Sequence, residues 1–531
     1  MSITLRRLLP PSLSILIPKQ ILMAAEAPEG PKQNRYDEWT REQLIERLNQ
    51  IDIRSRKVWT APPEPKDKKS FDFSRYARRK IALKFCYSGW EYSGLAFQFA
   101  PTPLPTVENV LFDVLSRTRL IDRDGGFEGC GWEKCGRTDR GVSAAGQVVS
   151  LWIRSALPPS EPLSLTESSG APEPAALDSD EDELLSLAMA ENASEPKRKA
   201  KLRQEHDYVA MLNRVLPDTI RILAWSPVSE TFSARFSCKF RHYKYFFPST
   251  HLDIPRMQAA AERLLGEHDF QNLCKVDAQK QITSFRRKIL RATVTPLDAS
   301  EGGAEGMHVL DLVGSAFLYH QVRHIMAILF LVGSGLEHPS IVSQLLNAAD
   351  NLESPRGDEH YVTLDRKPEY QMADALPLML WECGYDETQL DWQTSSHVAD
   401  DGGPSPAWTK LYHQLMGICN QSQVYLALNR HFLNAAMKYF PKPTSLLPLE
   451  NEMKYPEVTR GKHERDKYIN VPLGGGTFKR SQKYVPVMER TRLDKVEDIN
   501  ERWRTARELK LLKVGEKSES QVAGVENSES A

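Results

Sequence analysis

The stretch Gly129 to Arg154, GCGWEKCGRTDRGVSAAGQVVSLWIR, decides how the chain is organised. At its centre, the charged run RTDR occupies positions 137–140 between Gly136 and Gly141. Glycine permits a positive φ or a close approach of two backbones, so the two glycines predict a rigid turn. Residues 147–153 then alternate as in a β-strand. The stretch therefore predicts a carboxylate, Asp139, held in a turn at the start of a strand.

Asp139 has an arginine on each side in the chain, Arg137 two residues before it and Arg140 directly after it. Positive charge nearby favours the ionised carboxylate, which could then act as a nucleophile or a base near neutral pH. A solvated turn whose charges pair at the surface is the alternative, and it is the commoner outcome for an isolated RTDR. The four residues alone leave both interpretations open.

The longer run CGRTDRGVSA, residues 135–144, resembles the signature of the TruA-type pseudouridine synthases. That signature has G-R-T-D, then a basic or small residue, then G-V and a small residue. The resemblance implies that Asp139 is the catalytic aspartate. Arg140 stands where many eukaryotic relatives carry lysine, which keeps the positive charge.

A second segment, FSARFSCKFRHYKYFF at 232–247, interleaves basic and aromatic residues. Its second half alternates as a strand and would place Tyr243, Tyr245 and Phe247 on one face and Lys244 on the other. Cations bind phosphate and flat rings stack on an unstacked base, but a half-buried strand with core aromatics fits the pattern equally well. The spacing F-x-A-R followed by R-x-Y-x-Y resembles the second TruA-type motif, whose tyrosine corresponds to Tyr243.

The run FLYHQVRHIM, residues 317–326, predicts the start of a helix. The apolar residues at helical spacing would form its buried face: Val322, Ile325, Met326, Leu329 and Phe330. His320, Arg323 and His324 would lie on another face. The run resembles the family's F-x-x-H-x-V-R-x-I segment, which implies that Arg323 completes the active site by pairing with the aspartate. The family's following glycine is Ala327 here, another small residue.

The three motifs together imply three catalytic residues, Asp139, Tyr243 and Arg323. The candidate substrate-binding residues are the polar and aromatic side chains around them: Arg137, Arg140, Arg235, Arg241, Lys244, Tyr245 and His320. Converting uridine to pseudouridine needs no redox or metal step, so we expect no cofactor and no metal site. The seven cysteines include no C-x-x-C pair, which indicates neither a zinc site nor a disulfide framework.

The net charge of −1 conceals an uneven distribution. Residues 157–196 hold ten acidic side chains and no basic one, and without those ten negative charges a net charge of +9 remains. A basic body is compatible with a polyanionic partner. The acidic segment lacks a packable apolar pattern, so we expect a disordered insert. It ends in a basic cluster at 197–201 that fits either a nuclear-localisation signal or a solvated run.

The 531 residues suggest about two to four domain-sized units. We expect six segments: an N-terminal region (1–69), the first half of a catalytic body (70–156), the disordered insert (157–203), the second half of the body (204–390), a C-terminal helical and basic extension (391–513), and a disordered tail (514–531). The N-terminal region would consist of a tail, a short helix at 37–50 and a linker. The extension would contain a pair of helices at 408–440. The resemblance covers about residues 75–390. It implies an α+β pseudouridine synthase fold, a mixed, mainly antiparallel sheet from two similar halves, with helices outside and a central catalytic cleft.

Two further runs, CYSGWEYSG at 86–94 and GEHDF at 266–270, resemble the eukaryotic branch that modifies positions 38 and 39 of the tRNA anticodon arm. The resemblance implies tRNA as the partner, bound through its anticodon stem-loop and body, and a homodimer is a further expectation. A sister branch acting on other tRNA or mRNA sites and a non-catalytic tRNA-binding protein are the alternatives. No run of about 18 apolar residues occurs, so no membrane span is expected.

We expect the protein in the nucleus and the cytoplasm. Residues 1–22 are basic, moderately apolar and free of acidic residues, which also fits a mitochondrial presequence. That is the less favoured alternative, because the adjacent Pro10 and Pro11 interrupt a helical pattern.

Overall fold

The computed structural model describes residues 71–158, 205–298, 306–348, 353, 359–394, 406–440, 447, 469–481 and 483–509. These residues belong to one compact unit, residues 67–531. Several predicted features lie outside the described residues: the stretch 1–22, the helix at 37–50, nearly all of the acidic insert, the basic cluster at 197–201 and the tail after 513. They stay predictions, as do the localisation and the division into six segments.

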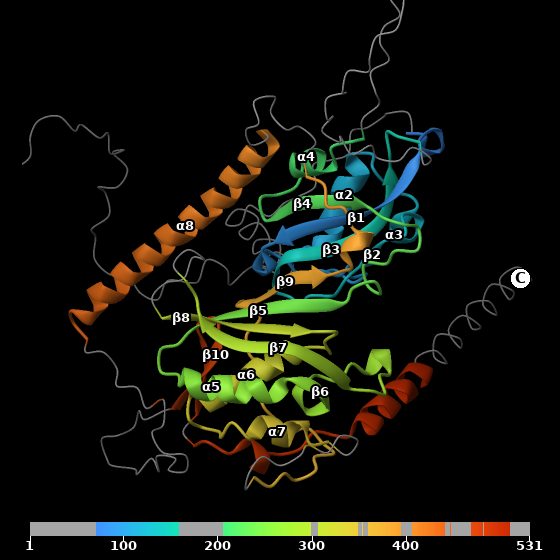
Figure 1. Ribbon diagram of the computed structural model, residues 1–531. Helices are drawn as coiled ribbons and strands as arrows, with labels where there is room; N and C mark the ends of the chain where they lie inside the picture. The colour runs from blue at the N-terminus through green and yellow to red at the C-terminus, as the bar shows by residue number, and fades with distance from the viewer. Residues whose placement is uncertain are drawn as a thin grey trace, which may run out of the picture. The chain divides into compact units, whose positions relative to one another are not determined.

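A nine-stranded sheet lies at the centre of the described part of the protein (Figure 1). Its strands are β1 (Arg78–Tyr87), β2 (Glu133–Lys134), β3 (Ser143–Arg154), β4 (Ile220–Pro227), β5 (Phe240–Pro248), β6 (Gly266–Asp269), β7 (Arg286–Pro296), β8 (Met307–Gly314) and β9 (Leu378–Gly384). They follow the order β4-β1-β3-β9-β5-β8-β7-β6, with β2 paired to β3. The pairing of β3 with β9 is parallel, and the other pairings within this sheet are antiparallel. The predicted α+β fold with a mixed, mainly antiparallel sheet is confirmed.

Strand β9 joins two parts of the sheet that differ in their helices (Figure 1). Beside β4, β1 and β3 lie the helices α2 (Val107–Arg117), α3 (Gly126–Gly129) and α4 (Tyr208–Asn213). The part with β5, β8, β7 and β6 carries α5 (Ile254–Ala261), α6 (Gln321–Gly333) and α7 (Ile341–Leu346). Short 3-10 turns connect these elements, among them Gly89–Glu91 and Gln271–Leu273. As a result, the loop before β3 and the first turn of α6 come from different parts of the sheet.

Helix α2 shows how directly local sequence signals specify an element. The hydroxyl of Thr106 accepts a hydrogen bond from the backbone N–H of Asn109 at 3.3 Å and so caps the helix. Val107, Val110 and Leu111 follow at helical spacing and are buried. A cap and an apolar stripe at helical spacing therefore account for this helix.

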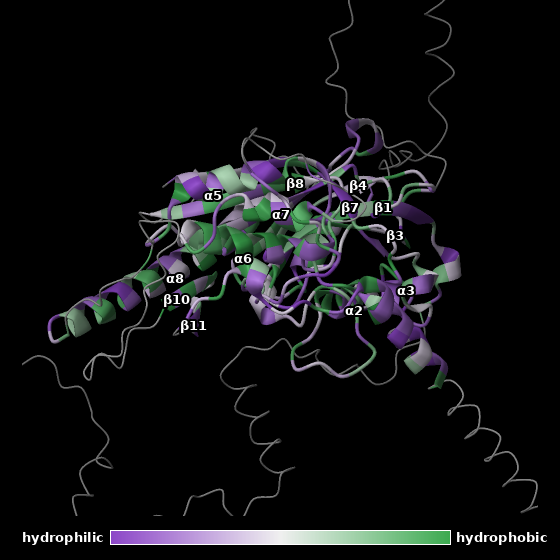
Figure 2. Ribbon diagram, turned by 90° about the horizontal axis from the view of Figure 1, so that it is seen from below, coloured by the Kyte–Doolittle hydropathy of each residue, from purple (hydrophilic) through white to green (hydrophobic). Residues whose placement is uncertain are grey.

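Helix α6 is the most completely buried helix of the core. Every residue from Gln321 to Gly333 except Arg323 is buried, and Figure 2 shows the helix in the hydrophobic colour. The hairpin of β10 (Ile469–Gly474) and β11 (Thr477–Ser481) packs into the same core through Ile469 and Val471. Part of the C-terminal extension therefore completes the core of the catalytic body.

Residues 406–437 form a single helix, α8 (Pro406–Met437), where the sequence predicted a pair. Gly417 lies inside it, and a glycine costs a helix only about 1 kcal/mol, too little to end one. Near its start, α8 is attached to the sheet: Leu411 is buried, and Arg221 of β4 donates a hydrogen bond to Gln414 at 3.1 Å. Residues 496–509 are also helical. None of the helices in the described ranges is both long and apolar enough to cross a membrane.

Candidate active site

The end of β1 and the segment after it hold the loop that carries Asp139. The hydroxyls of Tyr87 and Thr138 share a hydrogen bond of 2.6 Å, and the backbone N–H of Leu95 donates to the carbonyl of Thr138 at 3.3 Å. A Cβ on Gly89 would lie 2.1 Å from the Val142 carbonyl carbon, so only glycine fits there. These contacts fix the backbone on both sides of Asp139.

The turn itself depends on only one of the two glycines that bracket it. Gly141 has φ +85°, a conformation that other L-residues rarely adopt. Gly136 has no positive φ, and nothing lies within 4 Å of the Cβ position that it lacks. The prediction of a glycine-dependent turn is confirmed for Gly141 and wrong for Gly136.

Two side chains from the first turn of α6 reach Asp139. His320 Nε2 lies 3.2 Å from Asp139 Oδ2, and Arg323 Nη1 lies 3.8 Å from the same oxygen. The side chains of Asp139, His320 and Arg323 are 24%, 8% and 12% exposed, so the cluster is largely shielded from water. The geometry thus pairs Asp139 with Arg323, and it adds His320 as the nearer partner.

Arg137 and Arg140, which the sequence placed beside Asp139, point elsewhere. Both residues are exposed, and within the described part of the chain no ion pair joins either of them to Asp139. The positive charge near the carboxylate therefore comes from α6, on the other side of β9. Neighbours in the sequence were a poor guide here, because the side chains of an exposed turn diverge.

Arg323 is held by the segment that leads into β9. Its Nε donates to the carbonyl of Ala373 at 2.8 Å, and the N–H of Ala373 donates back to the Arg323 carbonyl at 3.1 Å. The next residue, Asp374, donates its N–H to Leu473 of β10 at 2.7 Å. The guanidinium is therefore oriented from two sides, by its own helix and by a segment braced on the C-terminal hairpin.

His320 has a backbone conformation that is unusual for its residue type. Its φ of 59° places it in the left-handed region, at the position before α6 begins. Such strain persists where surrounding contacts enforce it, and it is concentrated at functional sites. The imidazole packs against Tyr319, with ring centroids 3.8 Å apart, and among the described residues its buried Nδ1 has no hydrogen-bond partner.

Tyr243 lies near enough to this cluster for the charge of Asp139 to act on its hydroxyl. Its ring is partly buried and meets Phe317 edge to face, with centroids 5.0 Å apart. Burial raises the pKa of the Tyr243 hydroxyl above its ordinary value, and the charge of Asp139 is a smaller contributor in the same direction. Lys244 occupies the opposite face of β5 and lies over the ring of Trp381 at 4.6 Å, as the predicted alternation requires.

The remaining candidates separate into exposed and enclosed side chains. Arg235 is exposed and lies over the exposed ring of Phe236 at 5.1 Å. Arg241 instead donates to three backbone carbonyls, those of Ser315, Cys135 and Arg235. It thereby fastens the start of the catalytic loop to the second part of the sheet, a structural role that the sequence did not suggest.

Tyr245 is fully buried, which argues against the direct RNA contact predicted for it. Its hydroxyl donates to the carbonyls of Asp374 and Leu473, at 3.0 and 3.2 Å. It therefore braces the segment that holds Arg323. In the described part of the chain, no group of three or more His, Cys, Asp or Glu side chains could hold a metal ion.

Known proteins match this chain in sequence. A family model described as tRNA pseudouridine synthase matches residues 260–386. A Saccharomyces cerevisiae tRNA pseudouridine(38/39) synthase is 38% identical over 395 residues, which are 71% of this chain and 77% of the relative. The chain belongs to the tRNA pseudouridine synthase family. Its members are isomerases, and the resemblance of the motifs to the TruA-type enzymes is confirmed.

Other relatives of the family differ in the share of their own length that this chain covers. A tRNA pseudouridine(38/39) synthase of Mus musculus is 41% identical over 329 residues, 61% of this chain and 59% of the relative. A tRNA pseudouridine synthase A of the archaeon Methanothrix thermoacetophila is 28% identical over 321 residues and is covered to 87%. The chain thus spans about three fifths of the mouse protein and about three quarters of the yeast protein.

Proposed function

We propose that this protein isomerises uridine to pseudouridine at positions 38 and 39 of tRNA. The observation that carries the proposal is the convergence of His320 and Arg323 on one oxygen of Asp139, in a loop of the family's signature. The names of the mouse and yeast relatives support the two positions.

The reaction leaves the composition of the nucleotide unchanged. The N1–C1′ bond breaks, the uracil turns, and a C5–C1′ bond forms while C5 loses a proton and N1 gains one. The enzyme must therefore extract the base, hold it while it is detached, and exclude water. Neither an oxidant nor a metal is needed for this balance.

Each residue of the cluster has a role in these steps. An ionised Asp139 attacks C1′, adds to the base or accepts a proton, and all three roles need the carboxylate free of its proton and aimed. The guanidinium of Arg323 and the imidazole of His320, 3.8 and 3.2 Å from its Oδ2, orient the carboxylate. The ring of Tyr243 offers a surface for the extracted base, and such stacking returns about 1–3 kcal/mol of the few kcal/mol that flipping costs.

Exposed cations near the catalytic loop support tRNA as the partner. Arg137 and Arg140 flank Asp139 and face solvent, and Arg235 stands beside the exposed ring of Phe236. Phosphate contacts of this kind grip an RNA body without reading its sequence. Binding should weaken with salt, with log K falling by roughly 0.7–0.9 per phosphate contacted for each tenfold rise in salt concentration.

The test is to map pseudouridine after incubating the purified protein with unmodified tRNAs. One set carries uridine at 38 or 39, a second only at 27 or 55, and an isolated anticodon hairpin is the third substrate. We expect modification in the first set alone. Efficient reaction at 27 would assign the protein to the sister branch, and binding without any reaction would make it a non-catalytic tRNA-binding protein.

We further propose that the protein is a homodimer joined through α8. Beyond its attached first turns, the helix exposes apolar side chains along its length: Met416, Val424, Tyr425, Leu426, Leu428, Phe432, Leu433 and Met437. Residues 406–440 contain no acidic side chain. Exposed apolar surfaces of this extent mark interaction sites, and the α8 of a second copy would match this one in length and polarity.

Size-exclusion chromatography with light-scattering detection measures the oligomeric state and so tests this arrangement. Leu426→Glu combined with Leu433→Glu should convert a dimer into a monomer without unfolding the chain, because both side chains are exposed. Thr505→Glu adds the same kind of charge at an exposed site on the helix of residues 496–509 and is the control. A wild-type monomer, or a dimer unaffected by the α8 substitutions, would contradict the proposal.

A further inference from the structure

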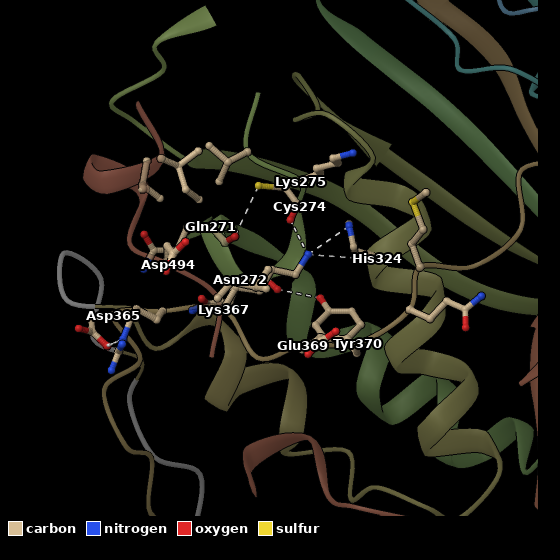
Figure 3. Close-up of a pocket in the computed structure, with 17 residues that line it drawn as sticks. Gln271, Asn272, Cys274, Lys275, His324, Asp365, Lys367, Glu369, Tyr370 and Asp494 are labelled. Carbon is tan, nitrogen blue, oxygen red and sulfur yellow. Dashed lines mark hydrogen bonds and ion pairs between the residues drawn. The ribbon is translucent and has the colours of Figure 1, made fainter. Parts of the chain in front are cut away.

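A pocket of about 450 Å³ lies beside α6, and Asp139 is not among the residues that line it (Figure 3). Its walls come from residues 271–276, 365–372 and 493–499, and α6 contributes His324, the residue directly after Arg323. The volume falls within the range of about 300–1,000 Å³ that is usual for small-molecule sites. The established family activity assigns no role to this pocket.

A lysine without a carboxylate partner lies at the pocket's inner end. Lys367 Nζ donates to the carbonyl of Cys274 at 2.5 Å and lies 3.1 Å from His324 Nε2 (Figure 3). Among the described residues, no carboxylate forms an ion pair with Lys367 or is among the groups that shift its pKa. Burial lowers that pKa to about 8, so the amine is still mostly protonated at neutral pH. A partly buried cation of this kind favours an anionic ligand.

The other charges around the pocket leave this positive charge uncompensated. Asp365 is paired with Lys495 at 3.1 Å, and Asp494 forms an ion pair with Arg502. Glu369 is exposed, and Lys275 adds a second cation to the lining. Burial, followed by the charge of Lys367, lowers the pKa of His324 to about 2, so the imidazole is neutral and does not compete for an anion.

Part of the pocket lining is apolar or aromatic. Tyr370 lies with its ring centroid 4.8 Å from Lys367 Nζ, and four aliphatic side chains also line the pocket: Val276, Leu493, Val496 and Ile499. A ligand that fills this space needs an anionic end next to a flat or apolar body. A nucleotide has both, a phosphate for the lysine and a base for the aromatic and aliphatic walls.

We propose that this pocket is a second binding site of the enzyme, which takes a nucleoside monophosphate with its phosphate on Lys367 and its base beside Tyr370. The nucleotide is either free in solution or part of the RNA chain. This second site goes beyond the proposed function, because a nucleotide can bind there whether or not the protein isomerises uridine.

Calorimetry on the full chain with uridine 5′-monophosphate (UMP), uridine and inorganic phosphate is the test. We expect UMP to bind more tightly than either fragment, and Lys367→Met to weaken it roughly 10–100-fold, the usual effect of losing a hydrogen bond to a charged group. Lys280→Met removes a cation from the neighbouring surface, outside the pocket, and should change nothing. Asp139→Ala should also keep UMP binding, which distinguishes the pocket from the catalytic site.

A second measurement covers the case in which Lys367→Met fails to fold. Pyridoxal 5′-phosphate carries a phosphate and an aldehyde, which condenses with an amine to an imine and water, and borohydride then fixes the product. Wild-type protein should be labelled at Lys367, with protection by UMP. Labelling spread over surface lysines without protection, or UMP binding that survives Lys367→Met in a folded protein, would overturn the proposal.

Two outcomes separate the sources of the nucleotide. If the pocket receives a nucleotide of the RNA, UMP should compete with tRNA, and Lys367→Met should raise the KM for tRNA. If the ligand is free, UMP should bind equally well to the enzyme and to its complex with tRNA. A protein that binds UMP here but modifies no tRNA would keep this inference and refute the proposed function.

Discussion

The two sides of the first turn of α6 carry similar side chains in opposite electrostatic situations. On one side His320 and Arg323 meet the carboxylate of Asp139, which comes from the other part of the sheet. On the other side Lys367 meets a neutral imidazole, a backbone carbonyl and the ring of Tyr370, and none of these carries a negative charge. The first network is complete within the protein and holds a reactive group in place. The second lacks its anion, and the comparison teaches that the charge balance indicates which site needs a ligand from outside.

The largest effect should come from removing the centre of the complete network. Asp139→Asn should lower turnover by on the order of 10⁴-fold or more, as for other essential catalytic residues, because the amide is neither a nucleophile nor a base. Single-turnover kinetics on tRNA would measure it, with melting temperature and tRNA affinity as controls. Substantial activity in this variant would refute the assignment of Asp139.

Arg323 and Arg137 make a matched pair of arginines, one inside the network and one outside. Arg323→Ala should lower kcat roughly 10²-fold, the usual cost of a misplaced reacting group. Arg137→Ala should leave kcat nearly unchanged and raise the KM for tRNA, because the side chain is exposed. An equal loss of kcat in the two variants would show that Arg137 also orients Asp139, which would contradict the role assigned to Arg323 alone.

Tyr243 tests whether the active-site side holds a base by its ring. Tyr243→Phe should keep most of the activity, whereas Tyr243→Ala should lose roughly 10–100-fold, consistent with stacking worth about 1–3 kcal/mol. The edge-to-face contact with Phe317 survives only in the phenylalanine variant. Identical rates for the two variants would show that the ring is not a platform for the base.

His320 sharpens the comparison, since it touches the aspartate directly while His324 faces the pocket. His320→Gln retains a side-chain N–H donor and should cost roughly 10-fold in kcat, less than His320→Ala, at an unchanged KM. His324→Gln is the matched substitution on the pocket side and should leave kcat unchanged. A loss that is equal for His320→Gln and His320→Ala would mean that only the ring's packing on Tyr319 matters.

The smallest effect concerns stability on the pocket side. Burial sets the pKa of Lys367 near 8, against 10.5 for an ordinary lysine. Between these values the unfolded chain binds more protons than the folded one, so this lysine makes the free energy of unfolding rise with pH. In urea titrations at pH 7.5, 9 and 10, Lys367→Met should lack that rise. Parallel curves for the variant and the wild type would contradict the burial of this charge.

Sequence patterns were most informative where a local signal sufficed. The buried face of α6 and the positive φ at Gly141 depend on residues a few positions apart, and the structure has them as predicted. Asp139 and Arg323 were found because each lies in a distinctive motif, although the motifs alone did not show that His320 is the nearer partner of the aspartate.

What the sequence could not supply is contact between distant segments. Arg241 and Tyr245 lie in a strand whose basic and aromatic residues suggest RNA binding. Their side chains instead donate hydrogen bonds to backbone carbonyls of residues up to 228 positions away. The brace on Arg323 uses backbone atoms of Ala373, whose side chain carries no signal. The alternation of residues shows which side chains share a face of a strand, but it does not show which distant segment packs on that face.

The hairpin of β10 and β11 has a consequence for how damaged copies of the gene should be interpreted. A stop codon between residues 395 and 468 would leave every motif residue in the translated product. That product would nevertheless lack Ile469, Val471 and the backbone of Leu473, so α6 would lose part of its apolar cover and Asp374 its partner. We therefore expect such alleles to yield an aggregating or rapidly degraded polypeptide, and their phenotype to be that of a missing protein rather than of an inactive one.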